Sequence, residues 1–220
     1  MKKIYADSFI EAVFNGETPK LAGDIYFQAV FMMGLSGSGK SYVKARKYLQ
    51  HTGFVDIDPD EIKKTHPKFN AERPFEVHEW SKDIADSMFN AVIKTGDPFV
   101  LDGTGTSPNK MAAKMESARS AGYRIFLVYV YTPFEISIWR NRNRSRFVPE
   151  SVIMEKAKEI SGSFAYLKTA ADKVKVVINF EESERGKALA DMEIYPPPFE
   201  MRPPRPNSPE YEAKKSGVKV

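Results

Sequence analysis

The sequence contains no cysteine in its 220 residues. Disulfides and thiolate metal sites are therefore excluded, and a reducing compartment fits this composition. No uninterrupted apolar run approaches the roughly 20 residues that a membrane span needs. Residues 1–7 also acquire charged and polar side chains too early for the apolar region of a secretory signal. From these absences we expect a soluble, cytoplasmic protein with no membrane partner.

The chain length suits one α/β domain with an appendage, and it is short for two full domains. The formal net charge is +4 and the sequence pI is about 9.0. This mild basic excess favours polyanions or phosphorylated metabolites as partners, but it does not establish nucleic-acid binding.

A phosphate-binding loop follows the apolar strand expected at residues 29–33. Its sequence fits the pattern G-x-x-x-x-G-K-[ST]. We expect the nucleotide to be bound by Gly34, Ser36, Gly37, Ser38, Gly39, Lys40 and Ser41. The alternative is a glycine-rich turn without a ligand, but the preceding strand and the helical spacing of Tyr42, Ala45 and Leu49 favour the loop.

The chemistry of this loop predicts ATP and Mg²⁺ as cofactors. The glycines let backbone N–H groups turn toward an anion, and the Lys40 ammonium reaches the β- and γ-phosphates. The Ser41 hydroxyl is the predicted metal ligand. Lys40 is therefore a catalytic candidate as well as a nucleotide-binding residue.

A group of acids follows the second expected strand, residues 54–58. Carboxylates beyond the carboxyl end of a strand next to the phosphate loop face the transferring phosphoryl group. Asp60 is the candidate base for an attacking hydroxyl, and Asp58 is a candidate for contacting the acceptor. The alternative is that Asp58 is an N-cap with Pro59 at the first helical position, and both roles can hold together.

A third strand, residues 99–101, ends at another acid and two threonines. Asp102 could sit in the second shell of Mg²⁺ or hold the acceptor, and Thr104 is assigned to the acceptor as well. The alternative is a glycine turn capped by Asp or Thr ahead of a helix.

Four arginines follow the fourth strand, residues 125–131, within a span of seven residues. They are Arg140, Arg142, Arg144 and Arg146, with no acid between them. Such a segment is typical of a lid that closes over the β- and γ-phosphates. A solvated basic loop or a nucleic-acid patch is the alternative, and spacing alone does not rank the four arginines.

The remaining pattern predicts a three-layer α/β fold with a mainly parallel five-stranded sheet. Residues 1–28 would cover a sheet edge, residues 74–95 form an amphipathic helix, and residues 174–179 are the fifth strand. We expect a domain of residues 1–185, followed by a Pro-rich tail of residues 186–220 that is extended or disordered. The tail holds seven of the 15 prolines, all between residues 196 and 209. The 74–95 helix should bury Val77, Trp80, Ile84, Met88 and Val92.

With these segments in hand, the chain resembles the zeta-toxin family of P-loop kinases over roughly residues 27–179, and more distantly the polynucleotide 5′-kinases. Residues 57–69 are similar to the segment that carries the catalytic aspartate of zeta toxins, including a following His-Pro-x-Phe. This match places the general base at Asp60 and makes His66 a structural mark of the segment.

Two further segments carry the resemblance. Residues 102–105 resemble the Glu-Gly-Thr-Gly turn of zeta toxins, with Asp102 in place of Glu. Arg140 and Arg146 match the two lid arginines and are the expected catalytic pair, although their spacing is shorter here.

The resemblance implies a P-loop kinase fold and ATP-dependent phosphorylation of an alcohol. The acceptor would be a UDP-sugar, as in zeta toxins, or a nucleic-acid hydroxyl such as a 5′-OH or a hydroxymethyl-pyrimidine in DNA. It also implies an inhibitory protein partner. The alternative from another class is a nucleotide-dependent switch or binding module that phosphorylates no acceptor.

Overall fold

The computed structural model describes residues 27–50, 53–71 and 73–217. The predicted edge segment at residues 1–28 lies outside this part of the chain, apart from its last two residues. Within the described ranges no helix has both the length and the apolar composition to cross a membrane.

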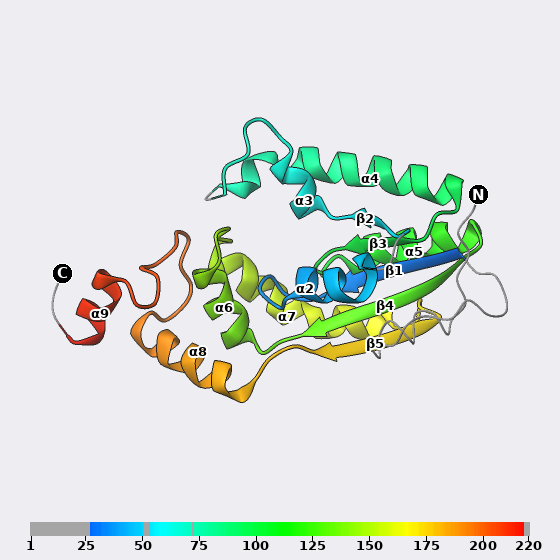
Figure 1. Ribbon diagram of the computed structural model, residues 1–220. Coiled ribbons are helices and arrows are strands. Elements are labelled where there is room, and N and C mark those ends of the chain that lie inside the picture. The colour runs from blue at the N-terminus through cyan, green and yellow to red at the C-terminus, as the bar shows by residue number, and fades with distance from the viewer. Residues whose placement is uncertain (1–26, 51–52, 72, 218–220) are drawn as a thin grey trace.

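Five parallel strands form one sheet in the order β2-β3-β1-β4-β5 (Figure 1). The strands are β1 (Phe27–Met33), β2 (Val55–Ile57), β3 (Phe99–Asp102), β4 (Tyr123–Tyr131) and β5 (Lys173–Ile178). The predicted five-stranded α/β sheet is confirmed, and every pairing in it is parallel. β1 is central and buried on both faces, which is why its sequence is a continuous apolar run.

Helices and short helical turns lie between the strands and, as α8 and α9, after the last one. They are α2 (Lys40–Lys44), the π-helical turn η1 (Ala45–Leu49), α3 (Pro59–Lys64), the 3₁₀ turn η2 (Pro74–Val77), α4 (His78–Thr95), α5 (Pro108–Ser120), α6 (Phe134–Asn143), α7 (Glu150–Leu167), α8 (Glu182–Ile194) and α9 (Pro209–Lys215).

The sheet divides the core into two layers. On one face, α4, α5 and α7 contribute Phe89, Met115 and Ile160 to a cluster around Phe31. On the other face, Val43 and Tyr48 from α2 and η1 pack on the central strands. The predicted three-layer architecture follows from these two clusters.

The predicted set of buried residues on α4 is wrong in part. Trp80 and Ile84 are exposed, whereas Ser81, Ala85 and Phe89 are buried, and Ala85 and Phe89 belong to the core cluster on this face of the sheet. The buried stripe therefore includes two small side chains that a pattern of large apolar residues does not contain. Trp80 lies at the margin, with its ring centroid 4.7 Å from that of His66.

The chain beyond residue 185, which was predicted to be an extended or disordered tail, contains helical segments. α8 runs across the predicted boundary, and α9 follows the proline-rich stretch. Apolar and aromatic contacts hold these elements, because Ala188 is buried and the rings of Tyr195 and Tyr211 stack with centroids 5.6 Å apart. The division of the chain into a domain ending at residue 185 and a separate segment stays a prediction.

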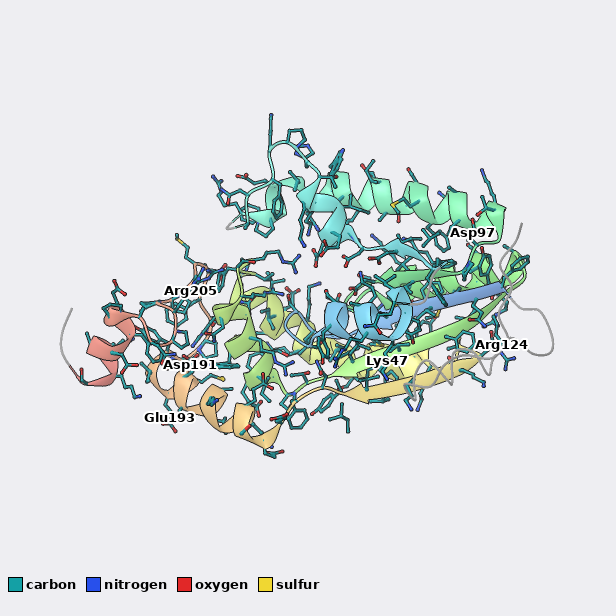
Figure 2. All side chains as sticks on the ribbon, in the orientation of Figure 1. Lys47, Asp97, Arg124, Asp191, Glu193 and Arg205 are labelled. Atoms are coloured by element: carbon teal, nitrogen blue, oxygen red, sulfur yellow. The ribbon has the colours of Figure 1, made fainter. Side chains whose placement is uncertain are left out.

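A buried ion cluster joins α8 to the region of the predicted lid. Arg142 on α6 has no exposed side-chain surface, and it bonds to Glu150 at 2.7 Å and to Asp191 at 2.8 Å. Figure 2 marks Asp191 near α6, and Glu193 on the outer side of α8. Arg142 is therefore a structural member of the arginine segment, because its donors are consumed inside the protein.

We predict that Arg142→Met lowers the free energy of unfolding by about 3–5 kcal/mol, because it leaves two buried carboxylates without a counter-charge. Chemical denaturation measures this change. The control is Arg185→Met, which removes an ion pair with Glu135 at the surface and should alter stability little. Equal effects of the two substitutions would contradict the structural role of Arg142.

Candidate active site

The phosphate loop is held in shape by glycines and by the ends of β4 and β5. Gly37 and Gly39 have φ angles of +92° and +87°, and an added Cβ at Gly39 would lie 2.1 Å from Asn179 Nδ2. The carbonyl oxygen of Ser38 accepts bonds from Thr132 Oγ1 at 3.1 Å and from Asn179 Nδ2 at 2.7 Å. Sequence reasoning missed these two anchors, since each is a single polar residue at the end of a strand.

Lys40 lies inside the loop. Its ammonium donates to the carbonyl oxygens of Gly34 at 2.9 Å and Leu35 at 3.1 Å. Burial lowers the pKa of Lys40, and the field of Asp102 opposes that effect. Ser41 follows at the start of α2 and is exposed, so its hydroxyl can reach a metal ion that accompanies the phosphates.

Asp58 caps α3 and thereby positions Asp60. Its Oδ1 accepts the backbone N–H groups of Asp60 at 2.8 Å and Glu61 at 3.4 Å, with Pro59 in the first turn. The N-cap interpretation of Asp58 is confirmed. Its other oxygen is engaged with Lys44, which leaves Asp58 little capacity to bind an acceptor.

Lys44 is a buried cation of this site that sequence reasoning missed. Its buried ammonium lies 2.8 Å from Asp56, 2.5 Å from Asp58 and 3.9 Å from Asp102. Burial opposes its charge, but Asp58 and Asp56 outweigh burial and raise the pKa of Lys44. The available signal was its position one helical turn after Lys40, which directs it toward the ends of β2 and β3.

Asp60 is paired with two cations. Its Oδ1 contacts the guanidinium of Arg146 and lies 2.9 Å from the ammonium of Lys63. Burial alone would raise the pKa of Asp60, but Arg146 and then Lys63 overcome it and hold that pKa well below its ordinary value. In this arrangement Asp60 is a weak base.

Arg140 reaches the phosphate loop from α6. It forms two bonds with Glu184, at 2.7 and 2.6 Å, and its Nη1 lies 3.4 Å from the carbonyl oxygen of Gly37. The bonds with Arg140 lower the pKa of Glu184. The structure therefore places Arg140 beside the loop and Arg146 beside Asp60, and each guanidinium is paired with a carboxylate.

Asp102 ends β3, and Thr104 lies two residues later, beside the start of the phosphate loop. Asp102 is buried, and its Oδ1 has no hydrogen-bond partner among the described residues. The backbone of Thr104 accepts the N–H of Gly34 at 3.2 Å, and its hydroxyl lies 2.9 Å from that of Thr106. Thr104 thus fixes the start of the loop.

The residues fit a nucleoside triphosphate with a magnesium ion. The unpartnered oxygen of Asp102 and the buried, unpartnered hydroxyl of Ser38 both belong to the phosphate-loop region. An acid and a hydroxyl beside a glycine loop are the groups that Mg²⁺ and its waters require when the metal is bound mainly through phosphate.

Residues 17–191 match the model of the Zeta toxin family. The chain belongs to the zeta toxin family. This membership supports a nucleotide-dependent kinase activity and agrees with the resemblance seen in residues 57–69 and 102–105. The comparison with curated proteins finds no match.

Solved structures share the fold of this zeta-toxin family member. A chain of the PezAT chromosomal toxin–antitoxin system of Streptococcus pneumoniae is 18% identical, with a TM-score of 0.57, and the match covers 80% of this chain and 78% of that one. A chain of the AvrRxo1-ORF1:AvrRxo1-ORF2 complex is 14% identical, with a TM-score of 0.54 and coverage of 74% and 54%. One from the Pnkp1/Rnl/Hen1 RNA repair complex is 19% identical, with a TM-score of 0.51 and coverage of 68% and 48%.

The stability of the folded chain should depend on pH through Asp102, the buried acid at the end of β3. Burial raises the pKa of Asp102 to about 7, although Lys40 offsets part of the effect. The folded protein therefore binds a proton that the unfolded chain, with an ordinary pKa near 3.9, releases. The stability that this proton contributes is present at pH 4 and lost as the pH rises through 7.

We predict that the nucleotide-free parent loses stability between about pH 4 and pH 7, and that Asp102→Asn reduces this loss, because the amide does not titrate. Denaturation midpoints measured across this interval provide the test. Asp83→Asn, on the exposed side of α4, is the matched control and should follow the parent. Parallel curves for Asp102→Asn and the parent would contradict the assignment.

Proposed function

We propose that this chain is an ATP- and Mg²⁺-dependent kinase that transfers the γ-phosphoryl group to a hydroxyl of a nucleotide-type acceptor. The observation that carries the proposal is the convergence of Lys40, Asp60 and the arginines of the lid on one edge of the sheet. This edge is formed by the carboxyl ends of the parallel strands, where α/β proteins bind their ligands (Figure 1).

Each residue has a defined part in the transfer. The loop amides and Lys40 would hold the phosphates, and the Ser41 hydroxyl would bind the Mg²⁺, with the Asp102 carboxylate available to its waters. Asp60 takes the proton of the acceptor hydroxyl. At the same time the acceptor oxygen forms a bond to the γ-phosphorus, and the bond between the γ-phosphorus and the ADP oxygen breaks. Arg140 and Arg146 neutralise the charge on the transferring group.

The pairing of Asp60 with Arg146 makes nucleotide binding a condition for base catalysis. A triphosphate in the loop attracts Arg146 away from the carboxylate, because phosphate carries more negative charge. Once Arg146 leaves, the larger of the two cationic effects that lower the pKa of Asp60 is removed, and only that of Lys63 remains. Asp60 then accepts a proton more readily, at the moment when a phosphoryl group is in place.

The acceptor is proposed from likeness to relatives. Zeta toxins suggest a UDP-sugar, and the similarity to a chain of an RNA repair complex suggests a nucleic-acid hydroxyl. The toxin–antitoxin systems among the similar structures suggest an inhibitory protein partner for this chain too. The alternative, a switch without an acceptor, has no use for a carboxylate that is placed beside the phosphate loop.

We expect Asp60→Asn to retain ATP binding within about twofold and to lose roughly 10²–10⁴-fold in the rate of transfer, since the amide cannot accept the proton. The control is Glu61→Gln, an exposed neighbour on the same helix. Titration calorimetry and labelled phosphate transfer supply the two measurements. If Asp60→Asn transfers phosphate at the parent rate, Asp60 is not the base.

Salt dependence separates the two classes of acceptor. Nucleic acid releases many counterions on binding, so its KM should rise steeply with added salt. A nucleotide sugar carries few charges, and its KM should rise only slightly. A nucleoside triphosphatase that is stimulated by a protein, and that yields no phosphorylated product with any acceptor, would support the switch instead.

A further inference from the structure

The four arginines of residues 140–146 differ in their partners. Arg140 pairs with Glu184, Arg142 with Glu150 and Asp191, and Arg146 with Asp60. Arg144 pairs with no carboxylate in the part of the chain that the structure describes. It therefore stands apart from the other three as a cation that has no protein anion.

The position of Arg144 is fixed at the phosphate loop. Its Nη2 donates to the hydroxyl of Ser36 at 2.7 Å and to Asn141 Oδ1 at 2.8 Å. Asn141 is itself bound to both backbone groups of Val148, at 2.8 and 3.0 Å. The guanidinium is thus held by a rigid side chain against a loop residue, and it is not a freely solvated group.

Nearby charges make this position favourable for an anion. The Nε of Arg144 is buried and has no hydrogen-bond partner in the described structure. Burial, together with the like charges of Arg146 and Arg202, lowers the pKa of Arg144 to about 10, although Asp60 opposes part of this effect. A dianionic group would accept a hydrogen bond from the Nε of Arg144 and would neutralise the local excess of positive charge.

The C-terminal segment contributes to this excess. Arg202 donates to the backbone oxygen of Ser145 at 2.7 Å, and its guanidinium carbon lies 5.8 Å from the centre of the Phe147 ring. Phe199, three residues earlier, exchanges backbone and side-chain bonds with Glu150. Residues 199–202 therefore brace the arginine loop and add a cation next to Arg144.

The contact with Ser36 indicates which phosphate is involved. Lys40, the loop lysine, contacts the carbonyl oxygens of Gly34 and Leu35, and Ser36 is the next residue. The lysine of a phosphate loop reaches the β- and γ-phosphates. Arg144 consequently faces the end of the loop that receives the terminal phosphate, away from the start of α2.

We propose that Arg144 binds the terminal phosphate of the nucleoside triphosphate through its Nε and Nη2 groups, with Ser36 holding the guanidinium in place until the nucleotide arrives. Arg144 thereby makes the site discriminate triphosphate from diphosphate. This inference rests on the nucleotide-binding part of the proposed function, and it adds a phosphate ligand to the Arg140 and Arg146 pair.

The test compares Mg²⁺ complexes of ADP and of a non-hydrolysable β,γ-imido analogue of ATP, by titration calorimetry on the full chain. For Arg144→Gln the affinity for the analogue should fall at least about tenfold, which corresponds to one charge-assisted hydrogen bond. The affinity for ADP should stay within about twofold of the parent. Retained ADP binding also shows that the variant is folded.

A control variant sharpens the result. Arg185→Gln, whose partner is Glu135 on the surface, is the matched control and should bind both nucleotides as the parent does.

Two outcomes overturn the proposal. Equal weakening of ADP and analogue by Arg144→Gln would mean that Arg144 only supports the loop. Unchanged affinity for both, with a raised KM for a phosphate-bearing acceptor, would place Arg144 on the acceptor instead. Because no acceptor enters the binding experiment, a chain that phosphorylates nothing would refute the kinase proposal and leave this result standing.

Discussion

The structure depends on the balance of charge at the carboxyl ends of β1, β2 and β3. Lys40, Lys44 and Arg146 lie there together with four aspartates, which are Asp56, Asp58, Asp60 and Asp102. A buried charge without a partner is costly, so Lys44 and Arg146 pair with these aspartates. Lys40 and Arg144 donate instead to uncharged oxygens of the protein, and these pairings determine which groups are available for chemistry.

The pairs fall into two kinds that differ in burial. Arg142 is enclosed with Glu150 and Asp191, and Lys44 with Asp58, so these pairs hold α6 to α8 and α2 to the end of β2. Arg140 and Arg146 pair with acids that solvent reaches, since the side chain of Asp60 is 45% exposed and that of Glu184 is 23% exposed. Enclosed pairs keep the fold fixed, and we propose that the accessible pairs exchange a carboxylate for a phosphate. One segment of seven residues would then serve both stability and phosphate binding.

Sequence patterns predicted the elements that local chemistry specifies. The phosphate loop, the acid at the end of each neighbouring strand and the parallel sheet are written in contiguous motifs and apolar runs. Lys44, Thr132 and Asn179 act through contacts between distant segments, which no local pattern contains. The buried role of Arg142 was hidden for the same reason, because its partner Asp191 lies 49 residues away, in a segment that was predicted to be part of an extended or disordered tail. The buried face of α4 was predicted wrongly in part, because Ser81 and Ala85 are small side chains that the apolar pattern did not count among the buried residues.

The central claim is that these charges are arranged to move a phosphoryl group onto a hydroxyl. The most direct measurement is transfer of labelled γ-phosphate from ATP across a panel of UDP-sugars, nucleosides, DNA ends and modified DNA, with Lys40→Ala as the control. With the parent chain we expect the label to become covalently attached to one class of acceptor, and with the variant we expect it to be attached to none. Release of the label only as inorganic phosphate, whatever acceptor is present, would contradict it.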